Sequence, residues 1–276
     1  MMKIQKINSQ LLSNFRCIGN DYDISFPSSL DDLDKISTDA FIIGSGTNTL
    51  FLNKQSTQII SLQELNNFNT DGNIVNAEAG ATLPMLIKEL KKKHLGGLCF
   101  SYPISATIGG AIRQNLGAYD QTISDLIIEV TCFNKDNKQL ITLTNKECEF
   151  GYRTSVLKNS SLVIISALLA LPSMPSTEIT KLCNTYKTKR ENNYQLNNNL
   201  GSIFKNPKGL SAGKLIDECG LKGFTHKSAS ISNDHANVIV AIKETKAEDI
   251  LALMKIVQET VKSKKNINLE PEITIY

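Results

Sequence analysis

The stretch DAFIIGSGTNTLFL, residues 39–52, decides the fold of this chain. β-Branched and aromatic residues on both sides of its glycine-rich centre predict two strands joined by a turn. A Rossmann dinucleotide site needs a turn that leads from a strand into a helix, so we exclude that fold. The turn is either a plain hairpin connection or a place where main-chain N–H groups approach a phosphate. Its residues are Gly44, Ser45, Gly46, Thr47 and Asn48.

A second glycine-rich stretch, TIGGAIRQNLGAY, occupies residues 107–119. Thr107 can donate its hydroxyl, and Gly109 and Gly110 allow a close approach of the backbone. Taken alone, this stretch is equally a turn followed by a short helix. Two such loops in one domain favour a pyrophosphate cradle for a large planar cofactor that carries a diphosphate.

The remaining patterns mix helices and strands, which predicts an α+β fold without a regular βαβ array. Pro172 and Pro175 indicate a domain boundary near residue 173. We expect helices within 24–36 (after a Ser28 or Ser29 cap) and over 82–94, 177–192, 212–220 and 247–266. We expect strands over 73–80, 127–134, 138–144, 162–171 and 235–242 and in the final NLEPEITIY.

Composition excludes several classes of protein. The 276 residues carry a net charge of +3, too little for a typical nucleic-acid-binding domain. Six cysteines without a CxxC pair and three histidines form no clustered ligand set, so we expect no metal site. Unpaired cysteines suit a reducing compartment. We find neither a signal peptide nor an apolar run of ~20 residues, so we expect a soluble cytoplasmic protein with no membrane contact.

The segment GSIFKNP, residues 201–207, carries the sharpest chemical signal. A serine is a weak acid, so Ser202 can donate a proton only to a strongly basic carbanion or enolate, or through a relay. Lys205 and Asn206 offer a cation and an amide to phosphate or uracil groups. The alternative is that Ser202 is only a helix or turn cap.

Two further places could stabilise such an anion. Arg153, in GYRTS, has the planar fork that suits a carboxylate or a developing enolate, although a surface ion pair is the commoner fate of an arginine. Glu270 and Glu272 flank Pro271, and one of them could orient the substrate or the donated proton. Their alternative is a pair of solvated surface carboxylates.

Seven segments in this order resemble the UDP-N-acetylenolpyruvoylglucosamine reductase family: GSGTNTL, TIGGAIRQNLGAY, FGYRTSVLK, GSIFKNP, AGKLIDECGLKG, SNDHANVIV and LEPEI. The resemblance runs from about residue 14 to the C-terminus and points to the compact type II subtype, without the extra tyrosine-bearing loop. It implies a PCMH-type FAD-binding region of two subdomains, residues 1–55 and 56–172. A substrate-binding α+β domain, residues 173–276, would follow, with its C-terminal strand returning to the active site.

The same resemblance implies that NADPH reduces FAD, and that the flavin passes a hydride to UDP-N-acetylenolpyruvoylglucosamine to give UDP-N-acetylmuramate for peptidoglycan. Ser202 would be the proton donor, and Arg153 with Glu272 would polarise the carboxylate and stabilise the enolate-like intermediate. We expect a monomer. The predicted FAD contacts are Gly44, Ser45, Gly46, Thr47, Asn48, Thr107, Gly109, Gly110, Asn115, Gly117, Ala118 and Tyr119. The predicted UDP contacts are Arg190, Lys205, Asn206 and Lys214.

The chain departs from the family pattern in three places. Pro103-Ile104-Ser105-Ala106 replaces Gly-Ile-Pro-Gly, Tyr194-Gln195 stands in a shortened connector, and Lys227-Ser228-Ala229 replaces Gly-Gly-Ala. None of these changes removes a predicted catalytic residue. They leave two other hypotheses open: a relative that only binds FAD or a nucleotide sugar, and another PCMH-type flavin oxidoreductase.

Overall fold

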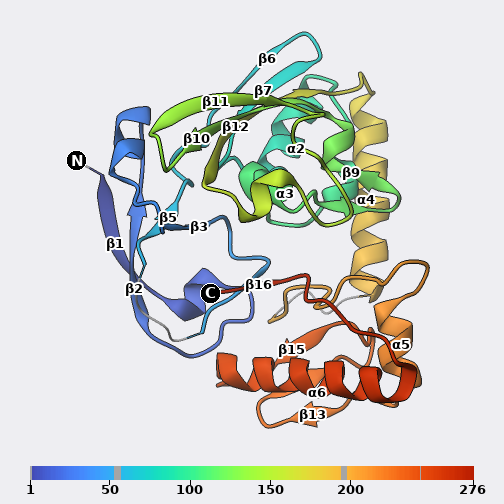
Figure 1. Ribbon diagram of the computed structural model, residues 1–276. Coiled ribbons are helices and arrows are strands. Elements are labelled where there is room, and N and C mark those ends of the chain that lie inside the picture. The colour runs from blue at the N-terminus through green and yellow to red at the C-terminus, as the bar shows by residue number, and fades with distance from the viewer. Residues whose placement is uncertain (1, 53–56, 194–197, 243) are drawn as a thin grey trace. The chain divides into compact units, whose positions relative to one another are not determined.

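The structure is a computed structural model that describes residues 2–52, 57–193, 198–242 and 244–276 (Figure 1). This part of the chain divides into two compact units. Unit 1 comprises residues 1–5, 23–45 and 56–188, and unit 2 comprises residues 6–22, 46–55 and 189–276. The helices are α1 Ser9–Leu12, α2 Leu83–Lys92, α3 Ile108–Arg113, α4 Ser176–Asn193, α5 Ala212–Glu218, α6 Ala247–Lys265 and the short 3₁₀ turns η1 Leu30–Lys35, η2 Cys99–Ser101, η3 Ile123–Asp125 and η4 Val156–Asn159. The strands are β1 Lys3–Asn8, β2 Asp21–Phe26, β3 Phe41–Ile43, β4 Thr49–Leu50, β5 Ile59–Ser61, β6 Phe68–Asp71, β7 Ile74–Glu78, β8 Gly117–Ala118, β9 Gln121–Thr122, β10 Ile127–Asn134, β11 Gln139–Thr144, β12 Leu162–Ala170, β13 Thr225–His226, β14 Ala229–Ile231, β15 Ile239–Ala241 and β16 Thr274–Ile275.

Unit 1 is built on an antiparallel sheet with the strand order β11-β10-β12-β7-β6. Apolar side chains of β10, β12 and β7 share one buried core with α2 and α3. Helix α2 contributes Leu83, Leu86 and Leu90, which recur at helical spacing and are fully buried. The edge strand β11 is mostly exposed, as an edge with alternating polar residues should be.

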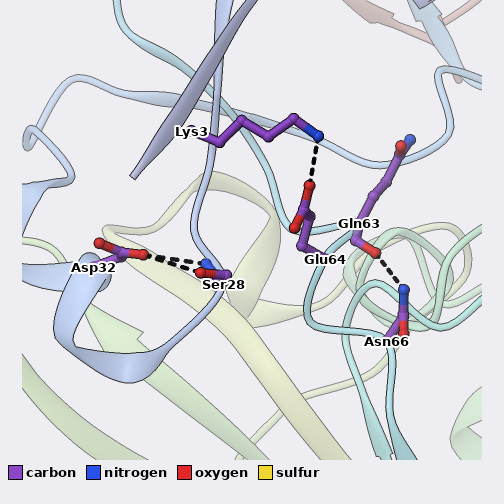
Figure 2. A network of polar contacts seen from close by, with 6 residues as sticks. All are labelled: Lys3, Ser28, Asp32, Gln63, Glu64 and Asn66. Carbon is purple, nitrogen blue, oxygen red and sulfur yellow. Dashed lines mark hydrogen bonds and ion pairs between the residues drawn. The ribbon is translucent and has the colours of Figure 1, made fainter. Parts of the chain in front are cut away.

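A second sheet has the order β1-β2-β5-β3, with β5 parallel to both of its neighbours. Polar contacts hold the loops around it (Figure 2). Lys3 pairs with Glu64 at 2.8 Å, and the Asp32 carboxylate accepts from the Ser28 N–H at 3.3 Å. The Asn66 amide closes a turn on the Gln63 carbonyl at 2.8 Å. The Ser28–Asp32 contact lies in the chain that leads into β3, and the other two hold the segment that follows β5.

Unit 2 centres on α6, which packs on β13, β14 and α5. Its apolar stripe of Ile250, Leu253, Met254, Val257 and Val261 is buried. Acidic residues lie in the first turn and lysines in the last, which suits the helix dipole. The helix ends where Asn266 takes a left-handed conformation at φ 56° and its N–H donates to the Lys262 carbonyl.

The C-terminal strand β16 runs parallel to β4, with Thr274 opposite Thr49 and Ile275 opposite Leu50. The Leu52 N–H donates to the Tyr276 carbonyl at 2.6 Å, and the Tyr276 ring lies 5.4 Å from that of Phe51. The end of the chain is thus fixed directly after the first glycine-rich turn.

The α+β prediction is confirmed, and most expected elements form within a few residues of their predicted ends. Three expectations were wrong in extent. The 24–36 helix is only the 3₁₀ turn η1, and just β16 forms in the tail because Pro271 offers no N–H for a regular ladder. Of 235–242 only β15 is a strand, because residues 235–238 form a turn in which the Val238 N–H donates to the His235 carbonyl. The boundaries at 55/56 and 172/173 stay predictions, and Tyr194-Gln195 lies outside the described residues.

Candidate active site

The two glycine-rich loops meet at Thr107 in unit 1. The Thr107 hydroxyl accepts from the Gly110 N–H at 3.2 Å, and a Cβ on Gly44 would lie only 2.6 Å from the same oxygen. A Cβ on Gly109 would lie 3.0 Å from the Ala79 side chain. Only residues without a side chain allow this close approach of two main-chain segments. The prediction that both loops belong to one cradle therefore has a geometric basis, and the cradle suits a diphosphate.

The second half of the first turn belongs to unit 2. Gly46 has φ +68°, and a Cβ there would lie 1.8 Å from the Leu12 carbonyl oxygen. No other residue fits this position, since both the conformation and the space require glycine. Asn48 then donates from its side chain to the Glu272 carbonyl at 3.3 Å and accepts at its own carbonyl from the Thr274 N–H at 2.9 Å. Thr47 lies between Gly46 and Asn48, and Ser45 directly precedes Gly46 in the sequence.

Arg153 lies beside the predicted flavin loop of unit 1. Its guanidinium donates to the Gly117 carbonyl at 2.8 Å. The Asn115 side chain joins the same two segments by donating to the Gly151 carbonyl at 3.0 Å. Arg153 has φ +55° in a tight turn that is closed by hydrogen bonds between Gly151 and Thr154. A non-glycine residue in this conformation is uncommon and often marks a functional position.

Tyr119 belongs to the same loop, after Ala118, and also has a positive φ of 56°. Its ring stacks on Tyr186 of α4, with centroids 4.6 Å apart and planes 19° apart. The Gln121 amide donates to the Tyr186 hydroxyl at 2.9 Å. Tyr186 was not predicted as a site residue, because nothing in the sequence connects it to a loop some 65 residues away.

Ser202 and Glu272, both in unit 2, lie on neighbouring extended segments. Phe204 and Pro271 form an antiparallel bridge, and the Glu272 N–H donates to the Ile203 carbonyl at 2.7 Å. On its other side, Ser202 faces Val238 in a second antiparallel bridge. The segments that carry the predicted proton donor and the predicted carboxylate are thus joined by main-chain pairing.

The four predicted UDP contacts lie in different settings. The Lys205 ammonium pairs with Glu270 at 2.6 Å, with the Glu270 side chain 70% exposed. The Asn206 side chain accepts from the Ala212 N–H at 2.9 Å, at the start of α5. Lys214, the third residue of α5, has a largely exposed side chain 3.9 Å from Glu218. Arg190 lies near the end of α4. The role of all four stays a prediction.

Asn237, which was not predicted as a site residue, contacts the segment that follows Ser202. Its side chain pairs with both main-chain groups of Phe204, two residues after Ser202. Its own N–H donates to Nδ1 of His235 at 3.2 Å. Burial lowers the pKa of His235, which favours the neutral ring that this bond requires. A polar side chain inside the apolar run HANVIV was the one available signal.

Among the described residues there is no cluster of three histidine, cysteine or carboxylate side chains that could hold a metal. No helix in the described part of the chain has both the length and the apolar character to cross a membrane. The closely approached glycines and the Thr107 hydroxyl are what a flavin dinucleotide diphosphate would require.

Comparison with known proteins agrees with this geometry. A sequence model described as the C-terminal domain of UDP-N-acetylenolpyruvoylglucosamine reductase matches residues 192–276, and one described as an FAD binding domain matches residues 30–143.

Full-length relatives extend the match. The UDP-N-acetylenolpyruvoylglucosamine reductase of Clostridium botulinum (strain Eklund 17B / Type B) is 36% identical over 85% of this chain and 78% of its own length. The protein of that name from Caldicellulosiruptor bescii is 34% identical over 95% and 86%. The crystal structure of the Thermus caldophilus reductase superposes with a TM-score of 0.86 over 100% of both chains at 27% identity. The chain therefore belongs to the UDP-N-acetylenolpyruvoylglucosamine reductase family.

Proposed function

We propose that this protein uses FAD and NADPH to reduce UDP-N-acetylenolpyruvoylglucosamine to UDP-N-acetylmuramate, a precursor of peptidoglycan. The observation that carries the proposal is the pairing of the Ser202 segment with Glu272 through the Glu272 N–H and the Ile203 carbonyl. This pairing holds Ser202 on the segment next to the one that carries Glu272. A serine is a weak acid, so it suits protonation of a strongly basic carbon.

The cradle at Gly44, Thr107 and Gly110 would hold the diphosphate of FAD, and the loop from Asn115 to Tyr119 would complete the site. When bound, the flavin supplies a hydride carrier that NADPH can reload. The fit is supported by the close approach of the two loops, in which the Thr107 hydroxyl stands where a side chain at position 44 would lie. The alternative of an FAD-binding relative without activity shares this cradle, so turnover of the sugar nucleotide is what separates the two.

Hydride addition to the enolpyruvyl methylene carbon leaves negative charge on the carbon next to the carboxylate. The Ser202 hydroxyl protonates that carbon, and the serine oxygen is then reprotonated from solvent. Arg153 and Glu272 act on the carboxylate while the charge is present: the arginine stabilises it, and the glutamate keeps the group polarised. In support, the Arg153 guanidinium is already oriented by the Gly117 carbonyl.

The test is substrate-dependent oxidation of NADPH by the purified protein, recorded with its flavin spectrum. We expect a yellow protein that consumes NADPH only when UDP-N-acetylenolpyruvoylglucosamine is present. A colourless protein that takes up no added FAD would contradict the proposal. A flavoprotein that oxidises NADPH at the same rate without the sugar nucleotide would instead favour another flavin oxidoreductase.

Two smaller parts of the proposal concern the cellular location and the oligomeric state of the protein. A cytoplasmic location is supported by the cysteines, since all six are free thiols and buried. A monomer is the expected state, and light scattering of the eluted holoenzyme measures it. A dimer mass would overturn that part alone and leave the reaction untouched.

A further inference from the structure

Asn237 is a buried polar residue whose side-chain amide forms hydrogen bonds with the main chain of another segment. Its side-chain oxygen accepts from the Phe204 N–H at 3.0 Å, and its side-chain nitrogen donates to the Phe204 carbonyl at 2.8 Å. Its main-chain carbonyl accepts from the Ile203 N–H at 2.9 Å. The residue is only 3% exposed. The asparagine therefore completes a strand-like pairing where no regular strand exists.

The main-chain groups of Ile203 and Phe204 are then fully satisfied. Asn237 binds three of the four, and the Glu272 N–H binds the last, the Ile203 carbonyl. Both side chains are at most 1% exposed, so packing fixes the segment as well. Ser202 directly precedes this segment, and little freedom remains to its hydroxyl beyond rotation about its own χ1.

We propose that Asn237 is a positioning residue, which sets where the Ser202 hydroxyl meets the carbon that it protonates. This inference rests on the proposed function. Only asparagine offers a donor and an acceptor at this reach, because aspartate loses the donor and glutamine is longer by a methylene. A displacement of about 1 Å at a reacting group can cost on the order of 100-fold in rate.

The proposal separates two half-reactions of the holoenzyme. Reduction of FAD by NADPH needs no proton from Ser202, whereas oxidation by the sugar nucleotide does. Asn237→Asp, which exchanges one amide for a carboxylate, should slow only the oxidative half-reaction, by about 10- to 100-fold. Lower pH should restore part of the rate, because a protonated carboxyl again offers a donor to Phe204. Asn237→Ser should show the same division between half-reactions without that recovery.

The matched control is Thr245→Val in the same unit. Thr245 is 1% exposed, and its single hydroxyl hydrogen is within reach of the Ser228 and Ile242 carbonyls, at O···O distances of 2.7 and 2.6 Å. This variant should lower the melting temperature yet keep both half-reactions. Hydrogen exchange provides a readout without turnover: the Phe204 amide, whose acceptor is the Asn237 side chain, should exchange faster in Asn237→Ser and not in Thr245→Val.

The proposal is overturned if the Asn237 variants keep the wild-type oxidative rate, or if they slow both half-reactions equally. It is also overturned if Thr245→Val gives the same kinetic division, since any buried hydrogen bond would then have that effect. Wild-type protein whose reduced flavin is not oxidised by the substrate overturns the proposed function instead. This failure of the proposed function is distinguished from a failure of the Asn237 proposal because it is seen in the wild-type protein, without any variant.

Discussion

The main-chain N–H of Glu272 lies 2.7 Å from the carbonyl oxygen of Ile203, and this hydrogen bond joins the tail of the chain to the serine segment. Residues some 70 positions apart in the sequence thereby become neighbours. The tail is in turn held by Asn48, whose side chain donates to the Glu272 carbonyl. One short tail thus contacts both the first glycine-rich turn and the residue that follows the predicted acid.

Replacement of Ser202 by alanine should separate the two halves of the catalytic cycle. Reduction of FAD by NADPH should stay near the wild-type rate, while oxidation by the sugar nucleotide should slow by ~10²–10⁴-fold because the proton donor is gone. Stopped-flow absorbance of the flavin measures both. Ser230→Ala, a change on β14 of the same unit, is the control and should leave both rates unchanged. If Ser202→Ala oxidised its flavin as fast as wild type, the assigned role would be wrong.

Glutamine at position 272 should harm turnover far more than glutamine at position 270. Glu270 forms an exposed ion pair with Lys205, and such pairs contribute only about 0–1 kcal/mol to stability. The Glu272 N–H is bonded to Ile203, next to Ser202, and in the proposed mechanism glutamine at this position weakens the polarisation of the substrate carboxylate. The measurement is the steady-state kcat of both variants, and their melting temperatures show whether each variant is folded. Equal losses would show that the two carboxylates are not distinguished by their position.

Alanine at position 44 should weaken both folding and FAD binding. Its Cβ would lie 2.6 Å from the Thr107 hydroxyl, and overpacking of this kind costs about 1–3 kcal/mol. Thr107→Ala alone removes a helix cap at about 1 kcal/mol. The double variant should be more stable than the two single effects predict, since the clash disappears with the hydroxyl. Urea unfolding and FAD titration of all four proteins measure this. Strict additivity would mean that the two residues do not touch.

Stability should depend on pH through His235. Burial lowers the pKa of its imidazole below the ordinary 6.5, so the unfolded chain binds the proton more readily than the folded one. This contribution to stability is complete above about pH 6.5 and is lost as the pH falls through the lowered pKa. In His235→Asn the side-chain oxygen can accept the Asn237 N–H as Nδ1 does, without titrating. Urea unfolding below pH 6.5 should therefore show a shallower pH slope, and an unchanged slope would contradict the assignment.

The thiols should be slow to react in the native protein. Burial raises the pKa of Cys17 and of Cys132 to about 12 and that of Cys148 to about 11, which leaves almost no thiolate at neutral pH. A chromogenic disulfide reagent should label the folded protein slowly and release six equivalents after denaturation, matching the six cysteines of the chain. Rapid labelling of three or more thiols in the folded state would show that these sites open readily.

Elements with strong local patterns were predictable, and elements defined by distant partners were not. The apolar residues at helical spacing in α6 predicted which of its side chains are buried. The alternation of apolar and polar residues on both sides of a turn predicted the hairpin of β10 and β11. The strand β5 is only three residues long and is defined by parallel pairing with β2 and β3, so no local pattern predicts it. The glycines of the cradle were predictable from residue type, because only glycine permits their contacts.

The site was predictable in its residue types but not in its hydrogen bonds. Ser202, Arg153 and Glu272 could be named from short motifs. That Lys205 pairs with Glu270, and that Asn237 binds the main chain of Phe204, depends on segments that folding alone brings together. Asn237 was therefore included in an expected strand, although its neighbours form a turn.

The hydrogen bonds from the Asn237 side chain to main-chain atoms determine which substitutions this region tolerates. Because the serine segment is held by its backbone, Ile203 and Phe204 can be exchanged for other apolar residues of similar volume without moving Ser202. Position 237 has no such latitude, since its side chain is itself the hydrogen-bonding partner. A saturation library over these positions should therefore accept several residues at 203 and 204 but essentially one at 237, although none of the three is predicted to touch the substrate.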